Sequence, residues 1–328
     1  MQMEGGNSFP PTRLRVLATI SMNASTFCRS LTPQYATVSG VRTHYVECGR
    51  GPTVVLLHGL SACFWNWWRN IPALAEHFHV VAFDLKGCGN SAKARGPYTT
   101  AACTEQLIGL LDQLGVDQAA IVGHSMGSRI AINTALTHPS RIRSLVLTSP
   151  SCYPQTGGRA VSFPVLPGIG ELYTQWLFTG RPEHLVRRAL RLCTHPTTDI
   201  TEEDIYWNMV SGLEQKRRLA QSYLRYGRQM QFHKPWSLSQ RYSEIGVPTL
   251  IISGDSDRLV PADHANRLAQ TIPGAKLEIW QHTGHLPHTE HAERFNQTAI
   301  AFLRDTRQSG QSGQRNYWGW LHRFLIRR

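Results

Sequence analysis

The stretch Ala-Ala-Ile-Val-Gly-His-Ser-Met-Gly, residues 119–127, decides the fold of this chain. An apolar run typical of a buried strand leads into the pattern G-x-S-x-G, and a helical pattern continues from Ser125 to Thr137. A sharp turn from a strand into a helix strains the backbone of its central residue, and glycines two positions on either side let strand and helix approach closely. The motif therefore predicts that the Ser125 hydroxyl stands at the carboxyl end of a strand, next to a helix N-terminus.

The sequence around this turn alternates between strands and helices joined by short turns. Apolar or alternating runs predict strands at 43–48, 53–57, 79–83, 119–122, 144–148, 248–253 and 276–280. Helical patterns fall at about 65–77, 104–114, 125–137, 264–270 and 290–303. Such alternation is typical of an α/β fold with a mostly parallel, doubly wound sheet that carries helices on both faces.

The alternation is interrupted between residues 153 and 240. There the chain reads as a loop followed by amphipathic helices, with many aromatic residues and no strong strand. Because strands and helices alternate again afterwards, we expect this segment to be an insertion in one sheet. The expected parts are a loosely ordered leader (1–34), a core (35–152 and 241–306), a helical cap (153–240), and a flexible linker with a basic aromatic tail (307–328).

The composition fits a globular chain in a reducing compartment. Of the 328 residues, 41% are hydrophobic and 17% are charged, which suits a large core rather than a disordered chain. The seven cysteines are scattered, odd in number and form no C-x-x-C pair, which argues against a disulfide framework and a structural zinc site. No apolar run reaches the length of a membrane span, so we expect a cytoplasmic protein.

The net charge of +12 directs attention to anionic partners. The segment 315–328 mixes aromatic residues with arginines and contains no acidic residue, as an interfacial anchor would. We expect this tail to contact an anionic membrane at its surface; docking on the protein's own surface or on a partner protein are the alternatives. No module or organised basic groove for nucleic acid is visible, so nucleic acid is not an expected partner, and the sequence does not indicate the oligomeric state.

Ser125 needs two partners to act as a nucleophile, because a serine hydroxyl alone is a weak one. The candidate base is His285, which lies between the last predicted strand and the last predicted helix. The loop 254–261 follows a strand and offers two carboxylates, Asp255 and Asp257, that could orient this histidine. Such a triad would let Ser125 attack a carbonyl carbon.

Four ordered motifs resemble those of the α/β-hydrolase family, and the resemblance covers about residues 35–303, with gaps in the cap. They are H-G at 58–59, D-x-x-G-x-G-x-S at 84–91, G-x-S-x-G at 123–127 and G-x-x-D-x-hydrophobic-V-P at 254–261. The resemblance selects Asp257 as the acid, with Asp255 as the second choice or as a loop cap. It also implies that the backbone N–H groups of Leu60 and Met126 form an oxyanion hole, which stabilises the tetrahedral intermediate.

Within these motifs, three residues narrow the expected chemistry. The nucleophile position holds serine rather than aspartate, which disfavours a haloalkane dehalogenase or an epoxide hydrolase of this fold. His58 is expected to tie its loop by hydrogen bonds rather than to act as a second base. Cys88 stands where the family more commonly has an aromatic residue or histidine, and without an evident basic partner we interpret it as a small buried thiol.

The substrate pocket is expected to be apolar and covered by the cap. Residues expected to line it are Trp65, His124, Trp176, Phe178 and Leu259. More than half of the cap's aromatic residues are expected to pack its own small core instead.

Histidines recur at positions 282, 285, 288 and 291, which imitates a metal-binding pattern. Pro287 prevents a regular helix through them, and zinc ligands converge on one point rather than spread around a turn. We therefore expect no metal site, and the predicted chemistry uses no cofactor.

The leading functional hypothesis is hydrolysis of an apolar carboxylic ester through an acyl-enzyme on Ser125. The same triad could instead cleave a C–C bond of a vinylogous diketone, hydrolyse a thioester or carry out perhydrolysis. An alternative of another class is a ligand receptor or scaffold that keeps a hydrolase fold with little turnover, although an intact Ser–Asp–His set argues against it.

Overall fold

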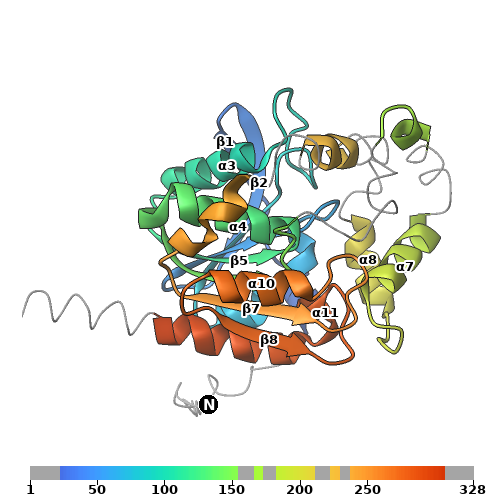
Figure 1. The fold of residues 1–328 in the computed structure, drawn as a ribbon. Coiled ribbons are helices and arrows are strands. Elements are labelled where there is room, and N and C mark those ends of the chain that lie inside the picture. The colour runs from blue at the N-terminus through green and yellow to red at the C-terminus, as the bar shows by residue number, and fades with distance from the viewer. Residues whose placement is uncertain (1–22, 154–165, 173–181, 211–221, 230–236, 307–328) are drawn as a thin grey trace, which may run out of the picture.

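The computed structural model describes residues 23–153, 166–172, 182–210, 222–229 and 237–306. Its centre is an eight-stranded sheet with the order β1-β2-β4-β3-β5-β6-β7-β8 (Figure 1). The strands are β1 (Gln34–Val38), β2 (Val41–Cys48), β3 (Thr53–Leu57), β4 (His79–Phe83), β5 (Ala119–His124), β6 (Ile142–Thr148), β7 (Thr249–Gly254) and β8 (Lys276–Trp280).

Strand pairing makes this sheet mostly parallel. β1 pairs antiparallel with β2, and β2 pairs antiparallel with β4. All pairs from β4 through β3 and on to β8 are parallel. Because the chain moves from β3 to β4 on one side and then to β5 on the other, its crossovers lie on both faces. The predicted mostly parallel, doubly wound sheet is confirmed.

Alternate side chains of each central strand supply two separate cores. In β3, Val55 and Leu57 belong to one core and Val54 and Leu56 to the other, and all four are fully buried. The first core is covered by α3 (Thr100–Gln113), α4 (Met126–Thr137) and α10 (Asp263–Thr271). The second is covered by α1 (Ala24–Arg29), α2 (Ile71–Ala75) and the helix 292–306. Burial on both faces explains the continuous apolar runs of the central strands.

Two local expectations differ from the structure. The single helix expected over 65–77 is divided into the 3-10 helix η1 (Phe64–Trp67) and α2, because Pro72 has no N–H to donate and begins a new helix. Within the expected leader, residues 24–29 form α1: the Asn23 side chain accepts a hydrogen bond from the Thr26 N–H, and Cys28 is fully buried. The rest of the leader, residues 1–22, lies outside the described residues.

The segment between β6 and β7 contains helices and no strand among the residues that the structure describes. They include α7 (Pro182–Cys193), α8 (Glu202–Val210) and the helical residues 222–229. Figure 1 shows α7 and α8 beyond the ends toward which the arrows of β7 and β8 point. Hydrogen bonds help to attach α8 to the core: Arg69 donates to both Asp204 oxygens at 3.0 and 2.9 Å, and the Trp207 indole donates to Ser25 at 3.3 Å.

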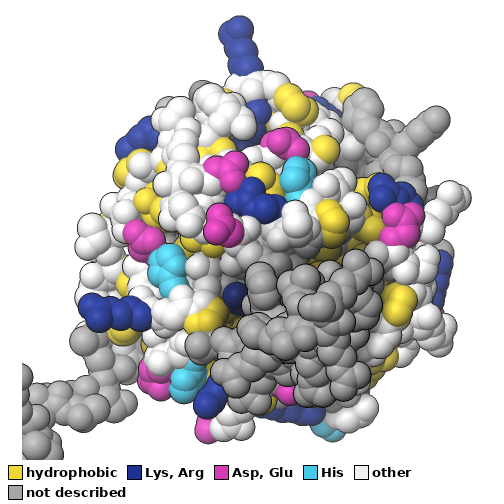
Figure 2. Space-filling view, turned by 90° about the vertical axis from the view of Figure 1, so that its left-hand side faces the viewer, with side chains coloured by type: hydrophobic (Ala, Val, Ile, Leu, Met, Phe, Trp, Pro, Cys, Tyr) yellow, Lys and Arg dark blue, Asp and Glu magenta, His cyan; other side chains and the backbone are white. Residues whose placement is uncertain are grey.

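The surface shown in Figure 2 carries charges of both signs. Among the side chains coloured there, basic and acidic groups are interspersed rather than gathered by sign. No described helix is long and apolar enough to cross a membrane. The basic aromatic tail lies outside the described residues, so its expected membrane contact stays a prediction.

The two-sided core predicts how substitutions affect stability. Leu56→Ala removes a fully buried side chain from the second core and should lower the free energy of unfolding by about 2–5 kcal/mol, the usual cost of such a cavity. Leu172→Ala makes the same chemical change at a side chain that is 70% exposed and should cost less than about 0.5 kcal/mol. Urea unfolding of both variants tests this, and equal losses would contradict it.

Candidate active site

Ser125 occupies a strained turn between β5 and α4. Its backbone has φ of +52° and ψ of −110°, and its N–H donates to the Thr148 carbonyl at 2.9 Å. A side chain on Gly123 would lie 2.7 Å from the Gly127 carbonyl oxygen, and one on Gly127 would meet the carbonyl oxygen of Leu57. Both glycines are therefore needed to bring α4 against the ends of β3 and β5.

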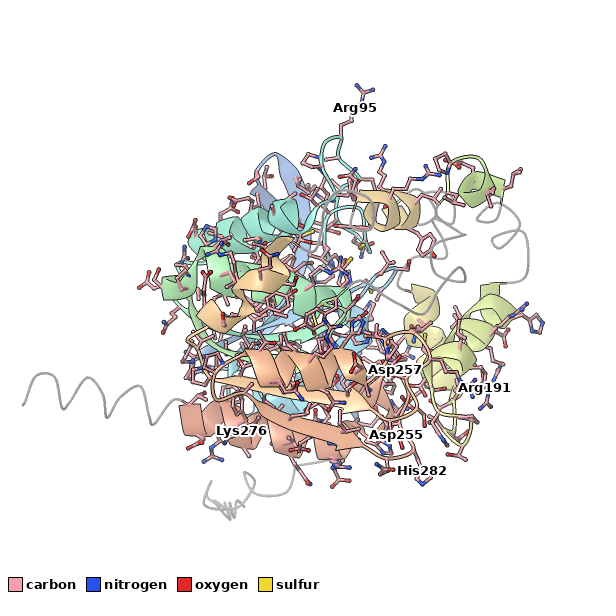
Figure 3. The ribbon with its side chains drawn as sticks, in the orientation of Figure 1. Arg95, Arg191, Asp255, Asp257, Lys276 and His282 are labelled. Atoms are coloured by element: carbon pink, nitrogen blue, oxygen red, sulfur yellow. The ribbon has the colours of Figure 1, made fainter. Side chains whose placement is uncertain are left out.

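The structure joins His285 to Asp257 and not to Asp255. His285 Nδ1 lies 2.6 Å from the Asp257 Oδ2 oxygen, and the Asp257 side chain is fully buried. Its other oxygen accepts from the N–H groups of Leu259 and Val260, both at 2.8 Å. Asp255 is exposed and accepts from the Thr283 N–H, so it caps the loop; Figure 3 places it on the side of His282.

His58 sets the direction of one predicted oxyanion donor. Its Nε2 accepts from the Leu85 N–H at 3.1 Å, so the proton sits on Nδ1 and is donated to the Gly59 carbonyl at 2.8 Å. Burial lowers the pKa of His58, which keeps this ring neutral. Since C=O and N–H of a trans peptide point in opposite directions, fixing the Gly59 carbonyl also fixes the Leu60 N–H.

The oxyanion loop packs directly against the serine turn. A side chain on Gly59 would lie 2.8 Å from His124 Nδ1 and 3.5 Å from the Ser125 Cβ. In the part of the chain that the structure describes, no protein acceptor pairs with the N–H of Leu60 or of Met126. These two donors therefore remain available to an oxyanion beside Ser125.

A polar network that the sequence did not reveal lies behind the nucleophile. The Asn66 amide donates to His124 Nδ1 at 3.2 Å and to His288 Nε2 at 3.0 Å. His124 therefore carries its proton on Nε2 and donates it to the His285 carbonyl at 2.9 Å. Burial lowers the pKa of His124 well below its usual value and that of His288 to about 3, so both rings are neutral.

The predicted pocket residues are only partly placed. His124 has both ring nitrogens bonded within the protein, so it supports the His285 loop rather than offering a free polar group to substrate. Trp65 is half-buried, with its ring 3.9 Å from that of Phe64 and 4.2 Å from that of Trp207. Leu259 is half-buried beside Asp257, and Trp176 and Phe178 lie outside the described residues.

Neither a metal site at the spaced histidines nor a reactive thiol at Cys88 is supported by the contacts in this region. Within the described ranges, no group of three or more His, Cys, Asp or Glu side chains could hold a metal ion. The four spaced histidines do not converge on one point, because His285 faces Asp257 while His288 faces Asn66. Burial raises the pKa of the Cys88 thiol, which makes it a weak nucleophile.

Taken together, these contacts form an arrangement suited to acyl transfer. The ring of His124, which directly precedes Ser125, lies 4.9 Å from the His285 ring, so the candidate base lies close to the turn that carries the candidate nucleophile. Asp257 holds the proton on His285 Nδ1, which leaves Nε2 to accept a proton from a hydroxyl.

The buried neutral histidines make stability depend on pH. In the unfolded chain histidine binds a proton below about pH 6.5, whereas folded His288 does so only near its pKa of about 3. The unfolded state thus binds more protons, and the free energy of unfolding should fall as the pH drops from about 6.5 toward 3. Urea unfolding between pH 7.5 and 4.5 should show this decline.

The matched variants are His288→Gln, which should make the decline shallower, and His184→Gln at an exposed position of α7, which should leave it unchanged. An identical slope for wild type and His288→Gln would contradict the assignment of a neutral, buried His288.

Comparison with known proteins agrees with this geometry. A family model for the alpha/beta hydrolase fold matches residues 52–292. The chain is 32% identical over 272 residues to the 2-hydroxy-6-oxononadienedioate/2-hydroxy-6-oxononatrienedioate hydrolase of Paraburkholderia phymatum, covering 80% of this chain and 91% of that protein. It is 31% identical over 271 residues to the 2-hydroxy-6-oxo-6-phenylhexa-2,4-dienoate hydrolase of Comamonas testosteroni, with the same two coverages.

A solved structure shares the fold at lower identity. The thermophilic esterase of Thermogutta terrifontis superposes with a TM-score of 0.70 at 21% identity, covering 84% of this chain and 99% of that one. The matched family model and the named relatives agree on one conclusion: this chain belongs to the alpha/beta hydrolase fold family, and it is a hydrolase.

Proposed function

We propose that this hydrolase cleaves a carbon–carbon bond next to a ketone, in a substrate of the vinylogous diketone class, with Ser125 as nucleophile. The observation that carries the proposal is the identity of 31–32% over 80% of the chain with hydrolases named for such substrates. The buried pair of His285 and Asp257 beside Ser125 supports the nucleophilic mechanism. The sequence alone favours ester hydrolysis, with C–C bond cleavage as an alternative. The named relatives favour C–C bond cleavage instead.

The named substrates explain why a serine hydrolase can break such a bond. In 2-hydroxy-6-oxo-6-phenylhexa-2,4-dienoate, the C6 ketone is conjugated through two double bonds to an enol at C2. In its 2,6-dioxo form, breaking the C5–C6 bond leaves the electron pair on C5, where it is delocalised through the C3–C4 double bond onto the C2 oxygen. The leaving carbon is therefore an extended enolate rather than a bare carbanion.

The residues then have assigned steps. His285 accepts the Ser125 proton as the Ser125 oxygen adds to C6, and the resulting oxyanion accepts hydrogen bonds from the N–H groups of Leu60 and Met126. As the C5–C6 bond breaks, His285 returns the proton to C5. Water, deprotonated by His285, then attacks the acyl-enzyme and releases a carboxylic acid and free Ser125. Asp257 keeps the His285 ring oriented throughout.

Hydrolysis of an apolar ester is the second candidate, and a specific observation favours it. The polar side chains packed against the nucleophile turn, Asn66, His124 and His288, are uncharged. None of these three is a cation that could pair with the carboxylate that the named dienoates carry, and the guanidinium of Arg129, one turn after Ser125, already donates to Ser151. The names of the relatives as hydrolases argue against the receptor or scaffold alternative.

A substrate panel distinguishes the two candidates. Purified full-length protein is given 2-hydroxy-6-oxo-6-phenylhexa-2,4-dienoate, whose conjugated chromophore is lost on cleavage, and 4-nitrophenyl esters of short and long acids. We expect kcat/KM for the dienoate to exceed that for the best ester by at least about 100-fold, because the transition state of the preferred substrate is bound more tightly.

Ser125→Ala is the control and should abolish both activities. Turnover of esters alone would replace the main proposal with the second candidate. Turnover that survives in Ser125→Ala would contradict both.

The two carboxylates of the acid loop provide a test of the triad. Asp257→Asn should lower kcat by about 10³- to 10⁴-fold, because the amide would orient the wrong tautomer of His285. Asp255→Asn makes the same change two residues away at the exposed loop cap and should lower kcat by less than about 10-fold. Steady-state kinetics of both folded variants decide this; a larger loss for Asp255→Asn would reverse the assignment.

A further inference from the structure

The backbone that carries His285 is fixed at three consecutive N–H groups. The N–H groups of Gly284 and Leu286 donate to Glu290 Oε1, at 2.9 and 3.3 Å. The N–H of His285 donates to the carbonyl of Cys193, the last residue of α7. The backbone at His285 therefore cannot move unless at least one of these hydrogen bonds breaks.

The same carboxylate also binds the inserted segment. Its Oε2 accepts from the His195 N–H and from the Thr198 hydroxyl, both at 2.7 Å. His195 and Thr198 belong to the turn that follows α7, where the Thr198 N–H donates to the His195 carbonyl at 3.0 Å. One oxygen of Glu290 thus holds the histidine loop and the other holds the turn after α7.

Glu290 makes these contacts as an anion without a cationic partner. In the described part of the chain no basic side chain lies within ion-pair distance of it, and its four donors are neutral. Hydrogen bonds to an ionised acceptor are roughly twice as strong as those between neutral groups. The charge therefore strengthens all four bonds, on both sides of the junction.

Side-chain packing closes this junction only in part. Leu286, next to His285, packs with Val186 and Leu190 of α7 and Ile205 of α8, but a cavity of about 380 Å³ lies along the junction, lined among others by Thr194, Thr198, His282 and Glu290. The backbones meet at Gly284, where a side chain would lie 2.5 Å from the Cys193 carbonyl oxygen, and at the hydrogen bond from the His285 N–H to that oxygen. The Glu290 carboxylate adds a polar connection between the turn after α7 and the His285 loop.

We propose that Glu290 is a positioning residue that couples the inserted segment to the catalytic base. The inference rests on the proposed role of His285 as that base. A displacement of the turn 195–198, such as substrate held against the inserted segment would cause, is passed through the carboxylate to the backbone of His285. Alignment of the base toward Ser125 then depends on where the inserted segment sits.

The experiment compares five full-length variants by two readouts. The readouts are kcat and KM for 4-nitrophenyl butyrate, or for the best substrate of the panel, and the rate of Ser125 labelling by a fluorophosphonate. The variants are Glu290→Gln, Thr198→Val, Thr198→Ser, the double variant of the first two, and Glu293→Gln. Glu293 is an exposed acid at the start of the helix 292–306, so its variant controls for the loss of one negative charge.

Glu290→Gln should lower kcat and the labelling rate by at least about 10-fold and change KM by less than about 2-fold, because a misaligned base slows chemistry rather than binding. Thr198→Val, which removes only the hydroxyl on the inserted segment, should lower kcat by about 3-fold, and Thr198→Ser should restore most of that loss. The double variant should be no slower than Glu290→Gln alone, since both changes act through one carboxylate. Glu293→Gln should match wild type.

Two outcomes would overturn the inference. One is a folded Glu290→Gln variant with wild-type kcat and labelling rate. The other is a Thr198→Val variant indistinguishable from wild type, which would leave Glu290 without a functional link to the inserted segment. If Glu290→Gln does not fold, the comparison of Thr198→Val with Thr198→Ser decides the question by itself.

His285→Ala separates this inference from the proposed function. If His285→Ala labels Ser125 at the wild-type rate, the proposed base is wrong, whatever the Glu290 variants do. If His285→Ala abolishes labelling while Glu290→Gln does not slow it, only the coupling through Glu290 is wrong.

Discussion

The left-handed backbone at Ser125 is the constraint on which the rest of the site depends. A φ of +52° at a non-glycine residue is costly, and it persists because the neighbouring packing leaves no alternative. The Gly123 and Gly127 positions have no room for a side chain against adjacent backbone. Gly59 also lies beside Ser125, so the same close packing brings the loop of Leu60, the proposed oxyanion donor, next to the serine turn.

The proposed catalytic base, His285, is by contrast held by contacts from four different places. Asp257 binds its ring, His124 binds its carbonyl, Cys193 binds its N–H, and Glu290 binds the residues on either side. Those partners come from the loop after β7, the end of β5, the end of α7 and α11 (Pro287–Glu290). A base that must move a proton gains from such support, because small misalignments at the reacting atoms have large effects on rate.

Features encoded by neighbouring residues could be predicted from the sequence, and those made by distant residues could not. The central strands and the Ser125 turn follow from local patterns, and the pairing of Asp257 with His285 was implied by the resemblance to the α/β-hydrolase family rather than by any local pattern. The division between η1 and α2 depends on a single proline, Pro72, within an apolar stretch, and α1 is a short helix in a leader with a weak periodic pattern. The Asn66 side chain bonds to His124, 58 positions away in the sequence, and to His288, 222 positions away. No rule based on sequence spacing predicts such contacts. The contacts of Glu290 could not be predicted either, since two of its four hydrogen-bond donors come from the inserted segment some 90 residues earlier.

The burial of His124 and His288 has an electrostatic consequence for the proposed turnover. In that mechanism His285 becomes a cation when it takes the Ser125 proton, with its ring 4.9 Å from that of His124. Two unit charges at that separation repel by about 3 kcal/mol at an effective dielectric constant of about 20. Burial lowers the pKa of His124 and of His288 and so keeps both rings from becoming cations first. Of these three crowded imidazoles, burial leaves the positive charge to His285, the one that transfers the proton in the proposed mechanism.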